Sequence, residues 1–501
     1  MVLTPKKIYE DLLKNEIDRS FAADLLISFI ENAEISETRL KGIEFLQKIE
    51  YKAQKVFSFL ENLLLSDYNT QIRILTAKTL ALLYEKKAIG PLEWALKHEK
   101  SLRCLVVITS IIAGFKDVDF KAVLIEKIKG FYNVQFKTSL NNFIKNNTIQ
   151  NFTPEVLAEI INNYVVIKKI EEIIEDFNYN LTQGLVYELD LSYIKHDSSS
   201  WRILKNLDKF LTVLKNLKWL SLKSNKIGAL PSSICGLSSI IHLDLSHNLI
   251  KILPDSIYNL KSLRDLDLKY NLLTRVPNSI GSLKSLEVLN LKHNILSNLP
   301  DSIKTLTSLK VLNLHGNSFR RVPKSIENLS SLERLELGLN KISSIPKWIK
   351  ELTSLRRLGL GRMRSIENIN EMIESIPFIT TLDLYGNNIE ALPDSTGRIT
   401  SLERLLLNNN KLSNLPKTLK NLKSLKQLDI SWNEFTALPN CIDSLCSLED
   451  LNISGNKFIT LPDSISSLPS LKTLNIKLNK YLIEIPESIK KLEQKGLKIY
   501  G

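Results

Sequence analysis

The chain has 501 residues, of which 44% are hydrophobic and 17 are glycine, so it is long enough for two or three domains and too apolar to be disordered. Its formal charge of +13 comes from one part of the sequence, because residues 1–180 carry 24 basic and 24 acidic side chains while the remainder carries 43 and 30. Spread over residues 181–501, this excess is too dilute to indicate a nucleic-acid-binding face by itself.

The sequence gives no sign of export or membrane insertion. Its start, MVLTPKKIYEDLLKNEIDRS, lacks the apolar segment of a secretory signal. The longest apolar run, 105–115, is far shorter than the ~20 residues that a membrane-spanning helix needs. The four cysteines are too scattered for a disulfide framework or paired metal ligands. We therefore expect a soluble, cytoplasmic protein with reduced thiols.

Residues 1–180 are expected to form an α-helical domain. Apolar residues recur there every three or four positions, as in IRILTAKTLALLY (72–84), and strand patterns are absent. A loop with an acidic residue and an arginine opens successive helices, ending at Arg39, Arg73 and Arg103. This phrase resembles HEAT and armadillo repeats, and the resemblance implies stacked helices in which Asp67 and Arg73 bond loops to helix ends.

Residues 181–216 are expected to hold an irregular first repeat and a capping helix. The segment VYELDLSYI (186–194) has the strand leucines Leu189 and Leu191, but the later repeats' asparagine position is Ile194. In SSSWRILKNLDKFLTVL (198–214), serines precede apolar residues at helical spacing. Terminal units of a solenoid must cover its open core, so this helix is expected to cap the array.

From residue 217 to the end, the chain repeats the phrase L-x-x-L-x-L-x-x-N-x-[IL]-x-x-[LIV]-P with a 23-residue period, which predicts a solenoid. The L-x-L alternation predicts a short strand with inward leucines, and successive strands should stack in parallel over one core. The buried asparagine should bond backbone groups of its own turn and the next, forming a ladder. The proline that follows favours extended or 3₁₀ segments on the convex side.

This phrase, with its return limb LPxSIxxL as in LPDSIYNLKSL (253–263), resembles the leucine-rich repeats of the intracellular Ras-group and disease-resistance-like class. The resemblance implies a right-handed α/β horseshoe of about thirteen units, with a parallel sheet on its concave face, after the helical domain. It also implies a signalling scaffold that binds small GTPases, phosphatases or other proteins.

One repeat, in 355–377, departs from the pattern. Met363 stands where the asparagine is expected, and SIENINEMIESIP (365–377) spaces its apolar residues helically and adds one residue. Glycines at concave positions 338, 359 and 361 should leave a hollow, with arginines around it, which is the pattern of an anion socket. The alternative is a decayed repeat whose arginines project into water.

The concave face is the candidate site for partner proteins, because its middle repeats are rich in arginine and aromatic residues, which dominate protein interfaces. The candidate protein-binding residues are Arg334, Glu336, Gly338, Arg356, Arg357, Gly359, Gly361, Arg362, Asp383, Tyr385, Arg404 and Trp432.

No catalytic motif, metal site or cofactor site is predicted. Cys441 lies in a CID triplet, but it takes the place of an ordinary repeat serine, so we interpret it as a packed thiol. His242, His247, His293 and His315 fall on several strands and in different columns, which disfavours a shared metal ion. We expect a non-enzymatic interaction scaffold. The alternatives are an anion-binding or nucleic-acid-binding protein, an enzyme without a recognisable motif, and a self-assembling array.

Overall fold

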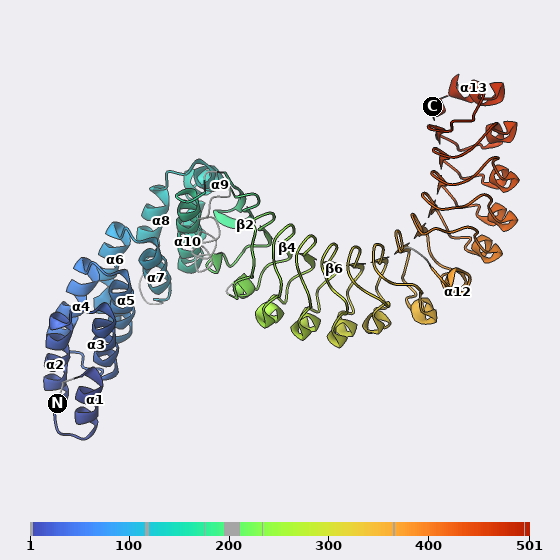
Figure 1. Cartoon of the computed structure of the whole chain (residues 1–501). Helices are drawn as coiled ribbons and strands as arrows, with labels where there is room; N and C mark the ends of the chain where they lie inside the picture. Colours follow the sequence, from blue (N-terminus) through green and yellow to red (C-terminus); the bar gives the residue numbers. More distant parts are fainter. Residues whose placement is uncertain are drawn as a thin grey trace. The chain divides into compact units, whose positions relative to one another are not determined.

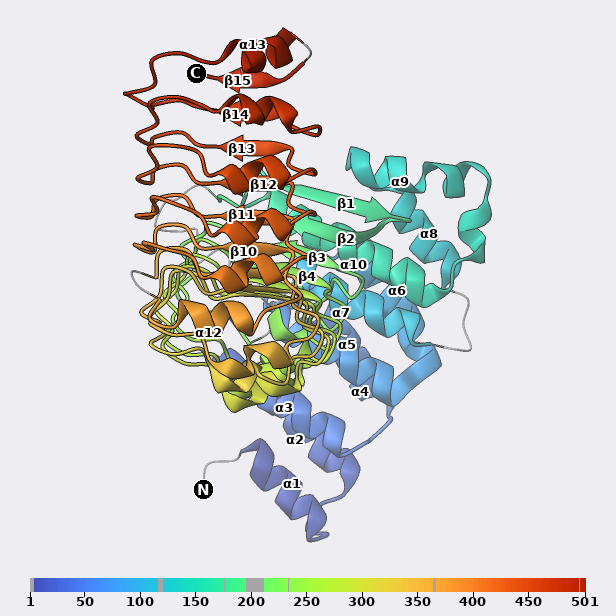
Figure 2. The same ribbon diagram turned by 90° about the vertical axis from the view of Figure 1, so that its right-hand side faces the viewer.

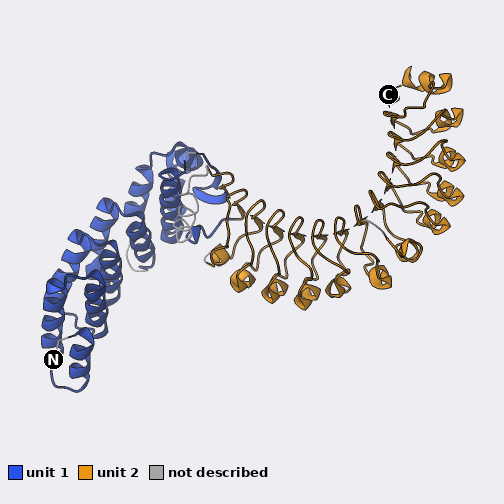
Figure 3. Cartoon of the chain, viewed as in Figure 1, with its two compact units in different colours: residues 1–189, 202–217 blue, residues 190–201, 218–501 orange. Residues whose placement is uncertain are grey.

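In the computed structural model the chain forms two compact units, residues 1–189 with 202–217 and residues 190–201 with 218–501 (Figure 3). The structure describes residues 4–115, 120–174, 176–194, 211–232, 234–363, 366–494 and 496–501. The expected capping helix within 198–214 lies mostly outside these residues. Within them, no helix combines the length and the apolar character that crossing a membrane requires.

The first unit is helical (Figure 1). Helices α2, α4 and α6 pack in one row, and α3, α5, α7 and α10 pack in a second row, so that consecutive helices form stacked hairpins. The helices are α1 (Pro5–Leu13), α2 (Arg19–Asn32), α3 (Ser36–Lys48), α4 (Gln54–Ser66), α5 (Thr70–Tyr84), α6 (Ile89–His98), α7 (Leu102–Ala113), α8 (Lys121–Lys129), α9 (Val134–Lys145) and α10 (Pro154–Glu171), with short 3₁₀ turns η1 (Glu85–Ala88) and η2 (Thr148–Asn151).

Polar side chains fix where these helices begin. The carboxylate of Asp18 accepts the Phe21 N–H at 2.8 Å at the start of α2. The amide oxygen of Asn69 accepts the Gln71 N–H at 2.8 Å at the start of α5. Each cap satisfies a backbone donor that has no partner inside the helix.

Two buried ion pairs join the helical hairpins. Arg39 pairs with Asp67, and Arg73 holds Glu99 with two hydrogen bonds of 2.8 and 2.9 Å. Arg73 also donates to the Asp67 carbonyl at 2.6 Å. Each arginine near the start of one helix thus anchors the loop that joins the two helices of the next hairpin. Asp67 and Arg73 have the structural role that their positions indicate.

A hairpin that the sequence pattern did not predict follows the helices of the first unit. Strands β1 (Asn178–Thr182) and β2 (Leu185–Asp190) are joined by Gln183 and Gly184, whose φ angles are 53° and 77°. Two consecutive positive φ values suit a two-residue hairpin turn. The Val186 N–H donates to the Asn163 amide oxygen of α10 at 2.7 Å, which anchors β2 to the helices.

The second unit is a solenoid with one three-residue strand per repeat (Figure 2). Equivalent residues pair directly in parallel, as Leu243 with Leu266 and Leu266 with Leu289. The strands are β3 (Trp219–Ser221), β4 (His242–Asp244), β5 (Asp265–Asp267), β6 (Val288–Asn290), β7 (Val311–Asn313), β8 (Arg334–Glu336), β9 (Arg357–Gly359), β10 (Thr381–Asp383), β11 (Arg404–Leu406), β12 (Gln427–Asp429), β13 (Asp450–Asn452), β14 (Thr473–Asn475) and β15 (Lys498–Tyr500).

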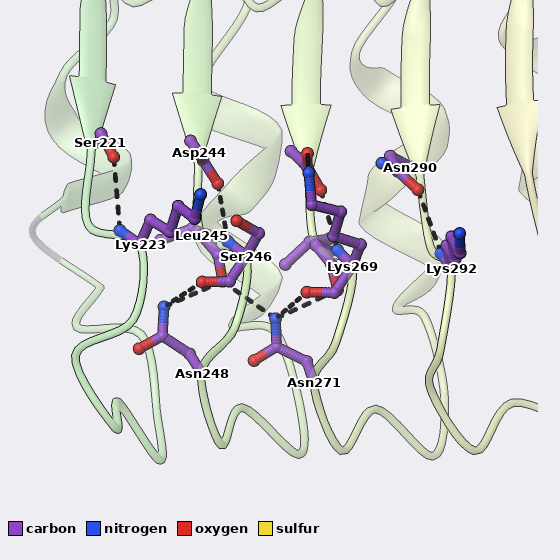
Figure 4. Close-up of polar contacts among 12 residues, drawn as sticks. Ser221, Lys223, Asp244, Leu245, Ser246, Asn248, Lys269, Asn271, Asn290 and Lys292 are labelled. Carbon is purple, nitrogen blue, oxygen red and sulfur yellow. Dashed lines mark hydrogen bonds and ion pairs between the residues drawn. The ribbon is translucent and has the colours of Figure 1, made fainter. Parts of the chain in front are cut away.

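The expected asparagine ladder is present. Asn271 donates to the carbonyls of Leu245, in the preceding repeat, at 2.9 Å and of Leu268, in its own repeat, at 3.1 Å. Its amide oxygen accepts the N–H of Ile250, again in the preceding repeat, at 3.0 Å. Figure 4 shows Asn248 and Asn271 in equivalent places beyond the ends of the strands. These asparagines are buried, and each pairs backbone N–H and carbonyl groups that the turn would otherwise leave buried without hydrogen bonds.

On the convex side, most repeats return through a 3₁₀ turn that follows the proline, as expected. Pro254, for example, has φ −68° and precedes η4. These turns are η3 (Ile234–Gly236), η4 (Asp255–Asn259), η5 (Asn278–Ser282), η6 (Asp301–Thr305), η7 (Lys324–Ile326), η8 (Lys347–Glu351), η9 (Asp394–Arg398), η10 (Lys417–Asn421), η11 (Asn440–Ser444) and η12 (Asp463–Ser467), and the last repeat has the helix α13 (Glu487–Gln494).

The irregular repeat has a helix in place of this turn, as its apolar spacing indicates. Helix α12 (Ile369–Glu374) buries Met372 and Ile373. Met363 takes the ladder position with 3% of its surface exposed, and its N–H donates to the Asn387 amide oxygen at 2.7 Å. The side chain of Asn368 donates to the Ile345 carbonyl at 2.8 Å and accepts the Ile345 N–H at 3.1 Å. Asn368 thus pairs backbone groups of the preceding repeat.

Candidate functional site

The parallel register places the candidate residues in columns across strands β8 to β11. Arg334, Arg357 and Arg404 begin their strands, and Glu336 and Gly359 end theirs. The expected concave arrangement of these positions is therefore present. The contacts of their side chains, however, differ from the expected hollow surrounded by arginines.

The expected hollow at Gly359 is filled by the protein itself. Glu336 has 7% of its surface exposed, and its Oε1 accepts hydrogen bonds from Arg334 Nε at 2.8 Å and Arg357 Nε at 2.6 Å. A Cβ at position 359 would lie 1.7 Å from Glu336 Oε2, so glycine is what leaves room for this carboxylate. The prediction of an empty anion socket is wrong, because Glu336 already supplies the anion. We call Arg334, Glu336, Arg357 and Gly359 the Glu336 cluster.

The other two glycines also lie under side chains of the protein. A Cβ at Gly361 would lie 2.0 Å from a ring carbon of Tyr385, and one at Gly338 would lie 2.4 Å from the Gly361 carbonyl oxygen and 2.8 Å from His315 Nδ1. The Arg362 guanidinium lies 5.5 Å from the centre of the Tyr385 ring, within cation–π range. Tyr385 and His315 thus continue the packed surface on either side of the Glu336 cluster.

The remaining candidates lie outside this cluster. Arg356 bonds the carbonyls of Thr353 and Leu355 at 3.2 and 3.1 Å. Arg404 donates to the Gln427 side chain at 2.8 Å. These two arginines and Trp432 are separate anchors, so the twelve candidates do not form a single socket.

Asp383 and Trp432 occupy two different environments. Burial raises the pKa of Asp383, whose carboxylate accepts the Tyr385 N–H at 3.1 Å. Trp432 is 54% exposed and lies against Gly455 of the next repeat, where a Cβ would meet its ring at 2.7 Å. Asp383 is therefore a packed part of the sheet, whereas Trp432 is available to a partner.

Arg356 belongs to a row that sequence reasoning missed. The residue just before each strand alternates in charge along much of the solenoid, and this could have been read from the repeat alignment. Glu287 pairs with Lys310 at 2.7 Å and with Arg264 at 3.3 Å, and Glu449 pairs with Lys472 at 2.6 Å. The row is Arg264, Glu287, Lys310, Glu333, Arg356, Thr380, Glu403, Lys426, Glu449 and Lys472.

A polar hollow of about 330 Å³ near the last strands was also not predicted. Asp429 bonds Ser431 and Asn452 there, and Asp450 accepts a hydrogen bond from Thr473 at 2.5 Å. The hollow lies on the concave sheet, since its lining comes from β12 to β15.

Two of the solenoid's histidines, His247 and His293, belong to a stack of aromatic rings. His247 and Tyr270 stack with centroids 4.5 Å apart, and so do Tyr270 and His293. Across the described residues, no group of three or more histidine, cysteine or acidic side chains is placed to hold a metal ion. Cys441 is buried, and burial raises the pKa of its thiol, which agrees with packing.

Comparison with known families identifies the solenoid. A family model described as a leucine-rich repeat region matches residues 189–294, 257–360 and 340–451, which together span more than half of the chain. The chain belongs to the leucine-rich repeat family. A second model, described as Leucine Rich Repeat, matches residues 447–468 of this leucine-rich repeat protein.

A solved structure agrees with this assignment, and a second is reported for its similarity alone. A leucine-rich repeat protein from Leptospira interrogans is 31% identical over 63% of this chain and 89% of its own, with a TM-score of 0.50. An internalin from Listeria monocytogenes is 20% identical over 75% of this chain and 96% of its own, with a TM-score of 0.49. No curated protein sequence matches the chain. The molecule is thus a helical region followed by a parallel-strand leucine-rich repeat solenoid.

Proposed function

We propose that this leucine-rich repeat protein is a non-enzymatic scaffold that binds partner proteins on the concave face of its solenoid. The observation that carries the proposal is the direct pairing of equivalent residues in β8 to β11, which sets Arg334, Arg357 and Arg404 in one row. Leucine-rich repeat proteins generally mediate protein interactions, which supports this reading.

Preorganisation gives this face a physical advantage. Arg334 and Arg357 are held by Glu336 before any partner arrives, so less side-chain freedom is lost when they form an interface. Arg404 and the ring of Trp432 are exposed anchors outside the Glu336 cluster.

The finer role is also a proposal. The Ras-group resemblance makes a small GTPase the first partner class to test, in a signalling pathway of the cytoplasm, where the four cysteine thiols would remain reduced. The stacked helical hairpins would serve as a second, HEAT-like protein-binding module. The domain limits that we propose are 1–180, 181–216 and 217–501.

The anion-binding or nucleic-acid-binding alternative predicts an affinity that falls steeply with salt. The alternating row argues against it, because its five basic residues are nearly balanced by four acidic ones, as where Glu287 pairs with both Arg264 and Lys310. A protein partner on this mixed surface should show a shallower salt dependence. An enzyme is disfavoured because no catalytic group of residues was recognised in the sequence.

The test compares captured partners for the full chain and for Arg404→Glu/Trp432→Asn. Asparagine already occupies the Trp432 position in another repeat, at Asn409, so the fold should tolerate it. A charge-reversal control, Lys350→Glu/Lys420→Glu, lies in the exposed convex turns. Partners quantified by mass spectrometry and then by calorimetry should bind at least tenfold more weakly to the concave variant only. Equal binding to all three proteins would exclude this part of the face.

A further inference from the structure

Three neighbouring repeats carry exposed aliphatic residues at a position that is polar in the other described repeats. This position follows the ladder asparagine, and Leu249, Leu272 and Ile295 are 45%, 38% and 50% exposed there. The equivalent residues in the other described repeats are Lys226, Ser318, Lys341, Asn388, Lys411, Glu434, Lys457 and Lys480. The repeat therefore folds with a polar residue at this position, so the three aliphatic side chains are not required for folding.

The same three repeats carry the stacked rings. His247, Tyr270 and His293 occupy the position before the ladder asparagine, with φ angles of 56°, 53° and 50°. Neighbouring rings are 4.5 Å apart and tilted by 18° and 23°. Elsewhere in the solenoid this position is often Ser, Asn or Gly. Two independent deviations from the repeat thus coincide in the loops after β4, β5 and β6.

The rings and the aliphatic residues share one surface. Asn248 lies between His247 and Leu249 and is 4% exposed, because its side chain bonds the core backbone. Its two neighbours therefore point outward, and the same holds in the next two repeats. We call His247, Leu249, Tyr270, Leu272, His293 and Ile295 the apolar ledge. Contiguous exposed apolar groups of this kind mark interaction sites.

Lysines border the ledge on the strand side. Lys269 and Lys292 lie beside the strand ends in two ledge repeats, and Lys223 takes the equivalent position in the repeat before the ledge, whereas the repeat of Leu249 has Ser246 there (Figure 4). Lys269 pairs with its own Asp267 at 3.2 Å, and Lys223 lies 5.3 Å from the Tyr193 ring. Among the described residues, Lys292 has no carboxylate within ion-pair distance.

Burial and neighbouring lysines lower the pKa values of the two histidines in the ring stack. Burial lowers the pKa of His247, and the charges of Lys223 and Lys269 lower it further. Burial and Lys292 lower the pKa of His293 in the same way. At neutral pH the ledge is therefore apolar, and its positive charge lies along one border.

The distance between equivalent ledge residues in neighbouring repeats indicates which secondary structure a partner would present. Equivalent residues in neighbouring parallel strands lie about 4.8 Å apart. Side chains three or four positions apart on a helix are about 5–6 Å apart, whereas same-face residues of an extended strand are about 6.8 Å apart. A helix thus matches three consecutive repeats more closely than an extended peptide does.

We propose that the apolar ledge binds an amphipathic helix of a partner protein, with an apolar stripe on Leu249, Leu272 and Ile295 and acidic side chains facing Lys223, Lys269 and Lys292. This docking mode lays the stripe of a helix on an apolar surface. The inference rests on the proposed function in that both describe a protein-binding solenoid, but it assigns a second surface and the chemistry of its ligand.

The test uses three synthetic helical peptides with the full chain. The first has leucines at positions i, i+3, i+4 and i+7 with glutamate flanks, the second has lysine flanks, and the third has glutamine in place of leucine. The ledge variant is Leu249→Ser/Leu272→Ser/Ile295→Ser, which follows the natural Ser318 and keeps the charge. The matched control is Ile459→Ser/Leu478→Ser/Ile483→Ser, which removes three aliphatic residues that are 51%, 62% and 81% exposed.

By fluorescence anisotropy, the glutamate peptide should bind the wild type at least tenfold more tightly than either other peptide. The ledge variant should lose at least tenfold in affinity, whereas the matched control and Arg404→Glu/Trp432→Asn should retain the wild-type affinity. Retained binding by the ledge variant, or equal binding of the lysine peptide, would overturn the proposal. Ledge-dependent binding to phosphatidylserine vesicles alone, or ledge-dependent self-association in sedimentation, would assign the surface to a membrane or to a second copy. Failure of the concave-face proposal is detected separately, with the Arg404→Glu/Trp432→Asn variant. Circular dichroism melts verify that each variant folds.

Discussion

Glu336 accepts a hydrogen bond from Arg357 at 2.6 Å across the boundary between β8 and β9, and its other carboxylate oxygen lies over Gly359. The absence of a side chain at Gly359 is therefore what makes room for the buried carboxylate of Glu336. In the neighbouring repeats the position of Gly359 is acidic or amide, so this glycine is specific to the Glu336 cluster.

Replacing Gly359 with alanine should destabilise the solenoid. The new Cβ would lie 1.7 Å from Glu336 Oε2, so the carboxylate must leave the two arginines or the backbone must shift. We expect a loss of about 1–3 kcal/mol in the free energy of unfolding, measured by urea denaturation. Gly228→Ala is the control, because nothing lies within 4 Å of its Cβ, and it should change stability by less than about 0.5 kcal/mol. Equal effects of the two substitutions would contradict the packing of Glu336 over Gly359.

Removing one rung of the asparagine ladder should cost more. Asn294→Ala leaves the carbonyls of Leu268 and Leu291 and the N–H of Leu273 without their side-chain partner. Buried unpaired groups cost about 1–3 kcal/mol each, so we expect a loss of about 3 kcal/mol or more. In the same repeat, Asn290→Ala removes a 3.2 Å bond to the Lys292 N–H beside solvent and should cost less than about 1 kcal/mol. A smaller effect for Asn294 than for Asn290 would be inconsistent with the ladder.

His315 should make the solenoid less stable in mild acid. Burial lowers its pKa to about 4, helped by Lys292 and His293, whereas the unfolded value is near 6.5. Below pH 6.5 the unfolded chain binds a proton that the folded chain refuses, so stability is complete above this pH and falls toward pH 4. After allowance for partial exposure, the loss should be about 1–2 kcal/mol.

The matched variant is His315→Ser, since Ser246, Ser431 and Ser454 occupy the same position in other repeats. Thermal melts between pH 4 and 7 should show a shallower pH dependence for this variant than for the wild type. An unchanged slope would show that His315 titrates normally in the folded protein.

The cysteines should differ in reactivity. Cys446 is exposed, whereas Cys104, Cys235 and Cys441 are buried, and burial raises the pKa of Cys104 to about 12. Iodoacetamide should therefore modify Cys446 first in the native protein, at least tenfold faster than the other three, because the thiolate is the reactive form. Peptide mapping by mass spectrometry measures each rate. Fast modification of Cys441 would contradict its packed position.

The sequence predicted the repeat, the inward leucines, the asparagine ladder and the convex 3₁₀ turns because each follows from a period that many units share. It predicted a helix in the irregular repeat because the apolar residues of 365–377 recur at helical spacing. Asn368 was missed because it lies off the ladder position, and the β1–β2 hairpin was missed because it has no repeating pattern.

The candidate site was harder to predict, because what fills a space depends on side chains from neighbouring repeats. Gly361 suggests an opening in its own repeat, yet Tyr385 from the next repeat covers it. Arg357 and Arg356 are adjacent in sequence, but one bonds Glu336 while the other bonds backbone carbonyls. Column positions can be read from the period, whereas the direction of a long side chain cannot.

The asparagine ladder also gives the solenoid a polarity. The side chain of Asn271 bonds the backbone of the preceding repeat at both Leu245 and Ile250, and Asn294 does the same one repeat later. Each repeat thus receives hydrogen-bond partners for its buried backbone from the asparagine of the next repeat. Backbone hydrogen bonds between strands are lost at either cut. Cutting the array from the C-terminal side also removes the asparagine side chain that pairs buried backbone groups of the new last repeat, whereas cutting from the N-terminal side instead exposes an asparagine side chain, which water can satisfy. The molecule should therefore unravel more readily from the C-terminal side than from the N-terminal side.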